Sequence, residues 1–191
     1  MNLFVMSMGK AGLGVEVRRR EASDAEWEWG LARGEVNVDS PVLFEITRGT
    51  VLPDVIWTGF YPIISAKALG LIEREGISGC RAYPCCLGTD QAVESPYFVL
   101  GVVRRCGEIS FVDGDSEACR IRVDAKGRRL LYAPLDVDLS GWDGSDVFMG
   151  RSKRTAHRCV SEKVYSAFRQ QKISGIRFDS LDQCEMCVGI V

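Results

Sequence analysis

Histidine is almost absent from this chain of 191 residues, because His157 is the only one. Catalysis by a Ser-His-Asp triad or a Cys-His pair would therefore have to use this residue. His157 lies in a basic segment just before an expected helix, where a surface or capping role is the commoner one. The sequence also lacks a phosphate-binding glycine loop, a dinucleotide fingerprint and a G-x-S-x-G elbow. We therefore expect no catalytic residue and no enzymatic activity.

Long apolar runs and an excess of one charge are also lacking. No run could span a bilayer, and the first ten residues have neither the basic start nor the cleavage site of a secretory signal. We therefore expect a cytoplasmic protein with no membrane partner. The net charge of −2 argues against a nucleic-acid partner. With 46% hydrophobic and 26% charged residues, the composition predicts one soluble domain over residues 1–191 and leaves the oligomeric state open.

Cysteine, in contrast, is common, with eight residues. In a reducing compartment we expect free thiols. Cys184 and Cys187 form a C-x-x-C pair that could bind zinc together with Cys85 and Cys86. Cys85 and Cys86 are adjacent, however, and a strand would send their side chains to opposite faces. We therefore expect no metal and no cofactor. The alternative hypothesis is a zinc- or thiol-dependent enzyme or regulator that uses Cys184, Cys187 and His157.

One pattern occurs twice, at Ile64–Arg81 and at Val160–Arg177, and the two segments align without a gap. The alignment matches Ser65 with Ser161, Lys67 with Lys163, the Ile-Ser-Gly triplets at 77–79 and 173–175, and Arg81 with Arg177. Apolar residues recur at helical spacing in both segments. The predicted fold is α+β, with two repeated helix-strand units at about 54–87 and 146–180 on a largely antiparallel β-sheet body. The alternative is two unrelated amphipathic helices.

Local signals predict the remaining elements. Ser65 and Gly76 suit the two ends of the first helix. Residues 1–8 and 14–20 are expected to pair around a glycine-rich turn, and Ser23–Gly34 fits either a strand or a helix. Hairpins are expected from Tyr97 to Tyr132. Asp136–Gly150 is expected to be an acidic loop that could hold one helical turn.

Several of these segments carry a family resemblance. They are W-D-G-S-D-V-F at Trp142–Phe148, V-S-E-K-V at Val160–Val164 and K-I-S-G-I-R-F at Lys172–Phe178. Over roughly residues 50–180 the chain resembles immunity proteins of bacterial polymorphic toxin systems, namely immunity family eleven and the double-CXXCG proteins. It departs from the latter because its only C-x-x-C pair lacks the following glycine. The resemblance implies a protein that binds and neutralises a cognate toxin domain by occluding it.

Such a protein needs a preformed surface with complementary charge rather than catalytic residues. Acidic loops would steer a toxin that has a basic substrate groove. We expect the partner-binding surface to include Asp113, Asp115, Glu117, Trp142 and Asp143, because they combine charge with one large aromatic on predicted loops. The alternative is that Trp142 belongs to the core and the acids form turns.

Overall fold

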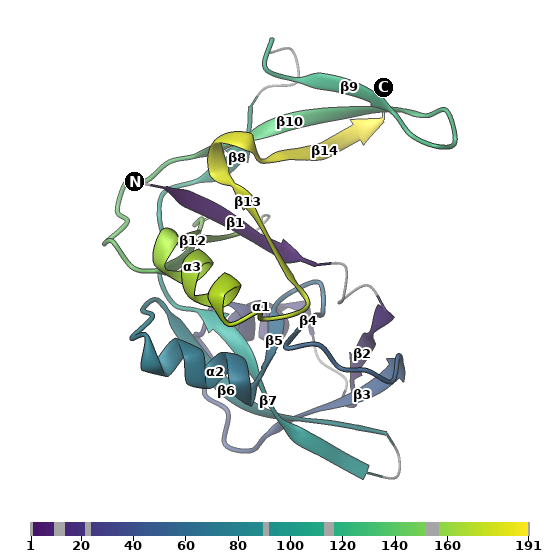
Figure 1. Cartoon of the computed structure of the whole chain (residues 1–191), viewed down its shortest axis with the longest axis vertical. Coiled ribbons are helices and arrows are strands. Elements are labelled where there is room, and N and C mark those ends of the chain that lie inside the picture. Colours follow the sequence, from purple (N-terminus) through teal and green to yellow (C-terminus); the bar gives the residue numbers. More distant parts are fainter. Residues whose placement is uncertain are drawn as a thin grey trace.

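The computed structural model describes the backbone of residues 2–9, 14–21, 24–89, 92–112, 117–151 and 157–190. It describes their side chains except at 89, 92–95 and 186–190. Over these ranges the fold is α+β, as predicted, with three α-helices and sheets that are mostly antiparallel (Figure 1).

The largest sheet has six strands in the order β2-β3-β6-β7-β5-β4. These strands are β2 (Glu16–Arg19), β3 (Val42–Arg48), β6 (Cys80–Thr89), β7 (Ala92–Val102), β5 (Pro62–Ser65) and β4 (Val55–Trp57). Helix α1 (Ala25–Ala32) packs on β7, where Leu31 and Ala32 are fully buried. Only β3 and β6 pair in parallel in this sheet, as far as its strands are described.

A second sheet has four strands in the order β11-β12-β1-β13, which are Val147–Met149, Arg158–Ser161, Leu3–Met8 and Ile176–Ser180. Strand β12 continues directly into α3 (Glu162–Gln170), as β5 continues into α2 (Ala66–Arg74). The two helices lie side by side (Figure 1). Their apolar faces share one core, to which α2 contributes Ala68, Leu71 and Ile72 and α3 contributes Val164, Ala167 and Phe168. The apolar stripes predicted for both helices therefore face the interior.

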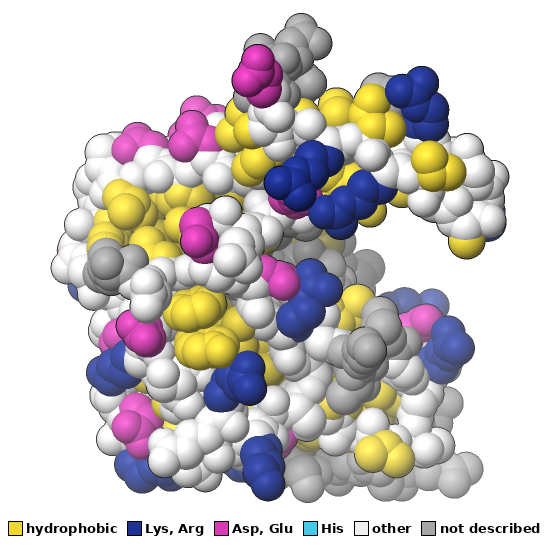
Figure 2. Space-filling view, turned by 45° about the horizontal axis from the view of Figure 1, so that its top comes forward, with side chains coloured by type: hydrophobic (Ala, Val, Ile, Leu, Met, Phe, Trp, Pro, Cys, Tyr) yellow, Lys and Arg dark blue, Asp and Glu magenta, His cyan; other side chains and the backbone are white. Residues whose placement is uncertain are grey.

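The third sheet forms an arm that projects from the body at the top of Figure 1. Its strands are β14 (Glu185–Ile190), β10 (Arg129–Val137) and β8 (Ile109–Phe111), and β9 (Arg120–Val123) also pairs with β10. Every residue of β9 is exposed. Figure 2 shows the arm overhanging a hollow on one face, with Lys and Arg side chains gathered on it.

Three local expectations needed correction or a decision. Strand β1 does not pair with β2: its partners are β12 and β13, whereas β2 pairs with β3. A strand as apolar as β1, with Leu3, Val5 and Met6 buried, is stabilised in the middle of a sheet rather than in an isolated hairpin. The Ser23–Gly34 segment contains a helix, α1, and the expected Asp136–Gly150 loop ends in strand β11.

The predicted ends of α2 are confirmed. The Ser65 side chain accepts a hydrogen bond from the backbone N–H of Ala68, and Gly76 follows the helix with a φ of 57°. Ser161 precedes α3 in the same way, but its side chain makes no cap hydrogen bond. Its hydroxyl group instead donates a hydrogen bond to the carboxylate of Asp146, a contact that the sequence did not predict.

Candidate binding site on the Asp138–Asp146 loop

Asp54, the residue before β4, links the two helix-strand segments. Its carboxylate accepts hydrogen bonds from the backbone N–H and the hydroxyl of Ser174, both at 2.9 Å, across the interface between the two segments. From its own segment it accepts hydrogen bonds from the Ser65 hydroxyl at 3.0 Å and from Lys67 Nζ at 3.2 Å. One carboxylate thus fixes a helix start and the turn that follows the other helix.

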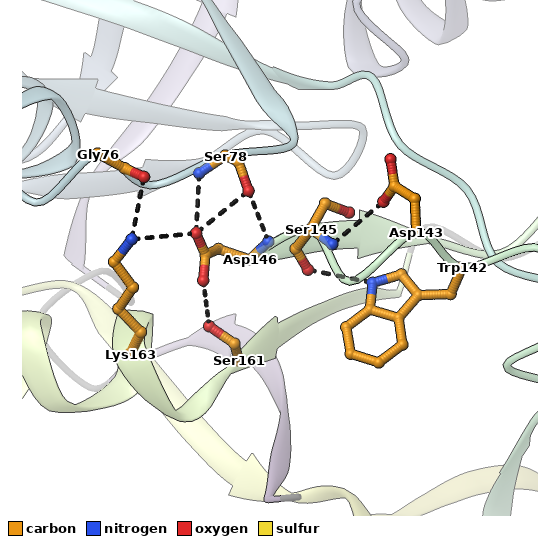
Figure 3. Close-up of polar contacts among 8 residues, drawn as sticks. All are labelled: Gly76, Ser78, Trp142, Asp143, Ser145, Asp146, Ser161 and Lys163. Atoms are coloured by element: carbon orange, nitrogen blue, oxygen red, sulfur yellow. Dashed lines mark hydrogen bonds and ion pairs between the residues drawn. The ribbon is translucent and has the colours of Figure 1, made fainter.

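Asp146, the residue before β11, makes a matching set of contacts (Figure 3). It accepts hydrogen bonds from the backbone N–H of Ser78 at 3.0 Å and from the Ser78 hydroxyl at 3.2 Å. It also accepts them from the Ser161 hydroxyl at 2.8 Å and from Lys163 Nζ at 3.4 Å. Each aspartate therefore holds the Ile-Ser-Gly turn that follows the opposite helix, and the two contacts close the interface from both sides.

Both carboxylates are charged at neutral pH. Burial alone would raise the pKa of Asp54, but hydrogen bonds from Ser174, Lys67 and Ser65 outweigh it and lower that pKa. The pKa of Asp146 is lowered in the same way, by hydrogen bonds from Ser78 and Ser161 and by the charge of Lys163. Because each carboxylate joins residues that are far apart in the sequence, we call Asp54 and Asp146 structural clamps.

The Asp146 clamp holds one end of the loop from Asp138 to Asp146. Within this loop the Trp142 indole donates a hydrogen bond to the carbonyl oxygen of Ser145 at 3.1 Å and packs against Phe148, with ring centroids 4.9 Å apart. The Trp142 side chain is half-buried and belongs to the core under the loop. Trp142 therefore anchors the loop. This agrees with the alternative that Trp142 belongs to the core.

Two exposed carboxylates lie on the same loop. Asp143 accepts a hydrogen bond from the backbone N–H of Ser145 at 3.1 Å and forms an ion pair with Arg104 at 3.2 Å. Asp138 accepts hydrogen bonds from the hydroxyl and the backbone N–H of Ser140. Hydrogen bonding from Ser145 and Ser140, respectively, lowers the pKa of both carboxyl groups. The loop thus presents charged groups in a fixed arrangement.

The expected binding residues lie on two segments. Asp143 is exposed on the loop, with Trp142 half-buried beside it. Glu117 is exposed just before β9, on the arm. Asp113 and Asp115 lie outside the described residues. Sequence reasoning missed Asp54 and Asp146, although the same pattern, Asp-Val followed by two large apolar residues, occurs at 54–57 and at 146–149.

The residues of the alternative hypothesis are differently placed. Cys184 is buried, and burial raises the pKa of its thiol, which disfavours the nucleophilic thiolate. The side chain of Cys187 lies outside the described part. His157 is half-buried with its ring edge-on to Phe111, and burial lowers its pKa. Cys85 is buried and its neighbour Cys86 half-buried, as a strand predicts. No group of three or more His, Cys, Asp and Glu side chains suited to a metal occurs among the described residues.

No helix in the described ranges is long and apolar enough to cross a membrane. No known family model matches the chain. A search of curated proteins also finds no match. The functional proposal therefore rests on geometry and on the resemblance of the motifs.

Proposed function

We propose that this chain is an immunity-type protein that binds a cognate toxin domain and neutralises it by occlusion, without catalysis. One observation carries the proposal: the Asp138–Asp146 loop offers exposed carboxylates that are already held in place. Its far end is fixed by the Asp146 clamp, and its middle is anchored by Trp142. A surface ordered before binding loses little conformational entropy when the partner arrives.

The charge of the loop suggests the chemistry of the partner. Asp138 and Asp143 are exposed, and Asp136 and Glu108 are exposed close by, where β10 pairs with β8. Negative charge of this kind accelerates association with a basic surface, such as the substrate groove of a nuclease. The toxin domain is therefore expected to present a basic groove to this loop.

We also propose that the segments at about 54–87 and 146–180 arose by duplication. Strands β4-β5-β7-β6 have the same order around α2 as β11-β12-β1-β13 have around α3. The contacts of Asp54 with Ser174 correspond to those of Asp146 with Ser78. Under this proposal the shared parts form the scaffold, and specificity lies in loops that differ between the copies, above all Asp138–Asp146.

The test is to examine the gene directly upstream for a toxin domain and to measure protection against that domain. Co-expression of the chain is expected to restore growth of cells that make this domain, and the purified pair is expected to form a complex. The double variant Asp138→Lys/Asp143→Lys is expected to slow association at low salt by about tenfold or more. The matched control, Glu73→Lys/Glu75→Lys, reverses two exposed charges on and next to α2 and is expected to associate normally.

Two results would contradict the proposal. One is a neighbouring toxin domain that is not neutralised, or no such neighbour. The other concerns the loop alone: an unchanged association rate for a folded Asp138→Lys/Asp143→Lys variant would move the binding surface elsewhere. Thermal melting of each variant separates loss of binding from loss of structure.

A further inference from the structure

A groove along α1 has a volume of about 750 Å³. The residues that line it include Asp24, Glu26, Trp27, Trp29, Arg33 and Glu35. Two half-buried indoles and three carboxylates thus share one groove with a single guanidinium. A cavity of this size accommodates a few side chains of an extended segment.

The indoles of this groove already bind cationic groups of the chain. The Arg19 guanidinium lies 3.7 Å from the centroid of the Trp27 ring, and that of Arg33 lies 5.5 Å from the Trp29 ring. Trp29 is also held edge-on by Phe60, with ring centroids 5.5 Å apart. Tryptophan is the best aromatic acceptor for a guanidinium. Both indoles of the groove thus already contact guanidinium groups, which shows that this surface suits arginine.

The carboxylates make the groove acidic. Asp24 caps α1 by accepting a 2.7 Å hydrogen bond from the backbone N–H of Trp27. Glu26 is exposed and forms no ion pair with a described side chain. Glu35 forms ion pairs with Arg33 at 3.9 Å and with Arg105 at 3.5 Å. Asp24 and Glu26 thus leave an uncompensated negative charge at one end of the groove.

We propose that this groove binds an extended, arginine-bearing segment of a partner protein. Arginine is the residue that satisfies both features, since its guanidinium stacks on an indole and pairs with a carboxylate. The groove is joined to the Asp138–Asp146 loop by two successive residues: Arg104 pairs with Asp143 and Arg105 with Glu35. Binding in the groove does not require that the partner be a toxin.

The test uses the whole chain and three short peptides, in which three arginines, lysines or glutamates alternate with glycines. Peptide binding is measured by fluorescence anisotropy at two salt concentrations. The arginine peptide is expected to bind more tightly than the lysine peptide, and the glutamate peptide is not expected to bind. The double variant Asp24→Asn/Glu26→Gln removes two charges but keeps a capping side chain, and it is expected to weaken binding about fivefold.

Two comparisons make the result specific to the groove. Glu73→Gln/Glu75→Gln removes two exposed charges on and next to α2 and is expected to leave binding unchanged. Trp29→Phe keeps an aromatic ring and is expected to weaken arginine binding about threefold, with a smaller effect on lysine. Equal losses in the α2 and α1 charge variants, or equal affinity for the arginine and lysine peptides, would overturn the proposal. Because no toxin is present in this assay, its outcome does not decide whether the chain is an immunity protein.

Discussion

Asp54 and Asp146 make the same set of hydrogen bonds in two different settings. Around Asp54, the Ser65 hydroxyl donates to the carboxylate and also accepts a hydrogen bond from the backbone N–H of Ala68, which caps α2. Around Asp146, the Ser161 hydroxyl donates to the carboxylate but does not cap α3. The start of α2 is thus capped by a side chain, whereas the start of α3 is not.

The loops beside the two clamps also differ. On the Asp54 side, five uncharged residues, Gly49–Pro53, lead from the end of β3 to Asp54. On the Asp146 side, the Asp138–Asp146 loop reaches the surface with two exposed carboxylates. The two clamps thus make matching contacts, whereas the loops beside them differ, and such loops are the better candidates for recognition.

The largest expected effect comes from the turns that the clamps hold. Gly79 and Gly175 have φ angles of 91° and 82°, and a Cβ atom there would overlap the carbonyl oxygens of Val147 and Val55. Gly79→Ala and Gly175→Ala are each expected to lower the free energy of unfolding by about 4 kcal/mol. The control Gly76→Ala, at a positive φ in open space, is expected to cost about 1 kcal/mol. Urea unfolding measures the stability of all three variants. Equal losses in the Gly76 control and in the other two variants would contradict the close approach of Gly79 and Gly175 to the carbonyl oxygens.

The next effect separates the two clamps. Asp54→Ala and Asp146→Ala are each expected to cost about 2 kcal/mol, because the half-buried and exposed serine and lysine donors around them lose a charged acceptor. Double-mutant cycles in urea sharpen the result: Asp146→Ala is expected to couple with Ser78→Ala by about 1 kcal/mol and not with Ser174→Ala. Coupling of Asp146 with both serines would show that the two clamps are not independent.

A smaller effect tests the difference between the helix starts. Ser65→Ala removes both a cap and a bond to Asp54, whereas Ser161→Ala removes only the bond to Asp146. The loss in unfolding free energy is therefore expected to be about 1 kcal/mol larger for Ser65→Ala. Helix content followed by circular dichroism, together with the urea midpoint, measures this difference. A larger loss for Ser161→Ala would contradict the assignment of the cap.

The smallest effect is the pH dependence of the clamps. Folding lowers the pKa of Asp54 and Asp146 below the ordinary value of 3.8, so below neutral pH the unfolded chain binds more protons than the folded one. Their contribution is complete well above pH 3.8 and is lost as the pH falls through the folded pKa. The free energy of unfolding is therefore expected to decrease as the pH is lowered from 7 to 3. Unfolding in urea from pH 7 to pH 3 tests this: Asp54→Asn/Asp146→Asn is expected to have a flatter acid limb, and an unchanged slope would contradict it.

Local features of the fold could be predicted from the sequence, and features that depend on distant segments could not. The Ser65 cap, the Gly76 stop and the apolar stripe of α2 are encoded within a few turns of chain, and the structure confirms them. The partners of β1 and the bond between Asp54 and Ser174 join residues more than 100 positions apart, which no local pattern specifies. At the candidate site, the exposure of Asp143 was predictable from its loop, whereas the anchoring of Trp142 depends on Phe148 and the core beneath it.

The placement of β1 has a consequence for how the chain reaches its fold during synthesis. Strand β1 lies between β12 and β13, and each of its partners is made more than 150 residues later. During synthesis β1 therefore cannot form its sheet, and its apolar side chains stay exposed to solvent until nearly the whole chain has left the ribosome. Strands β4 to β7 and α2 are closer in sequence and can assemble earlier. Completion of the four-stranded sheet is thus expected to be the slow, late step, and the interval before it is the period in which the chain is most exposed to aggregation and to chaperones.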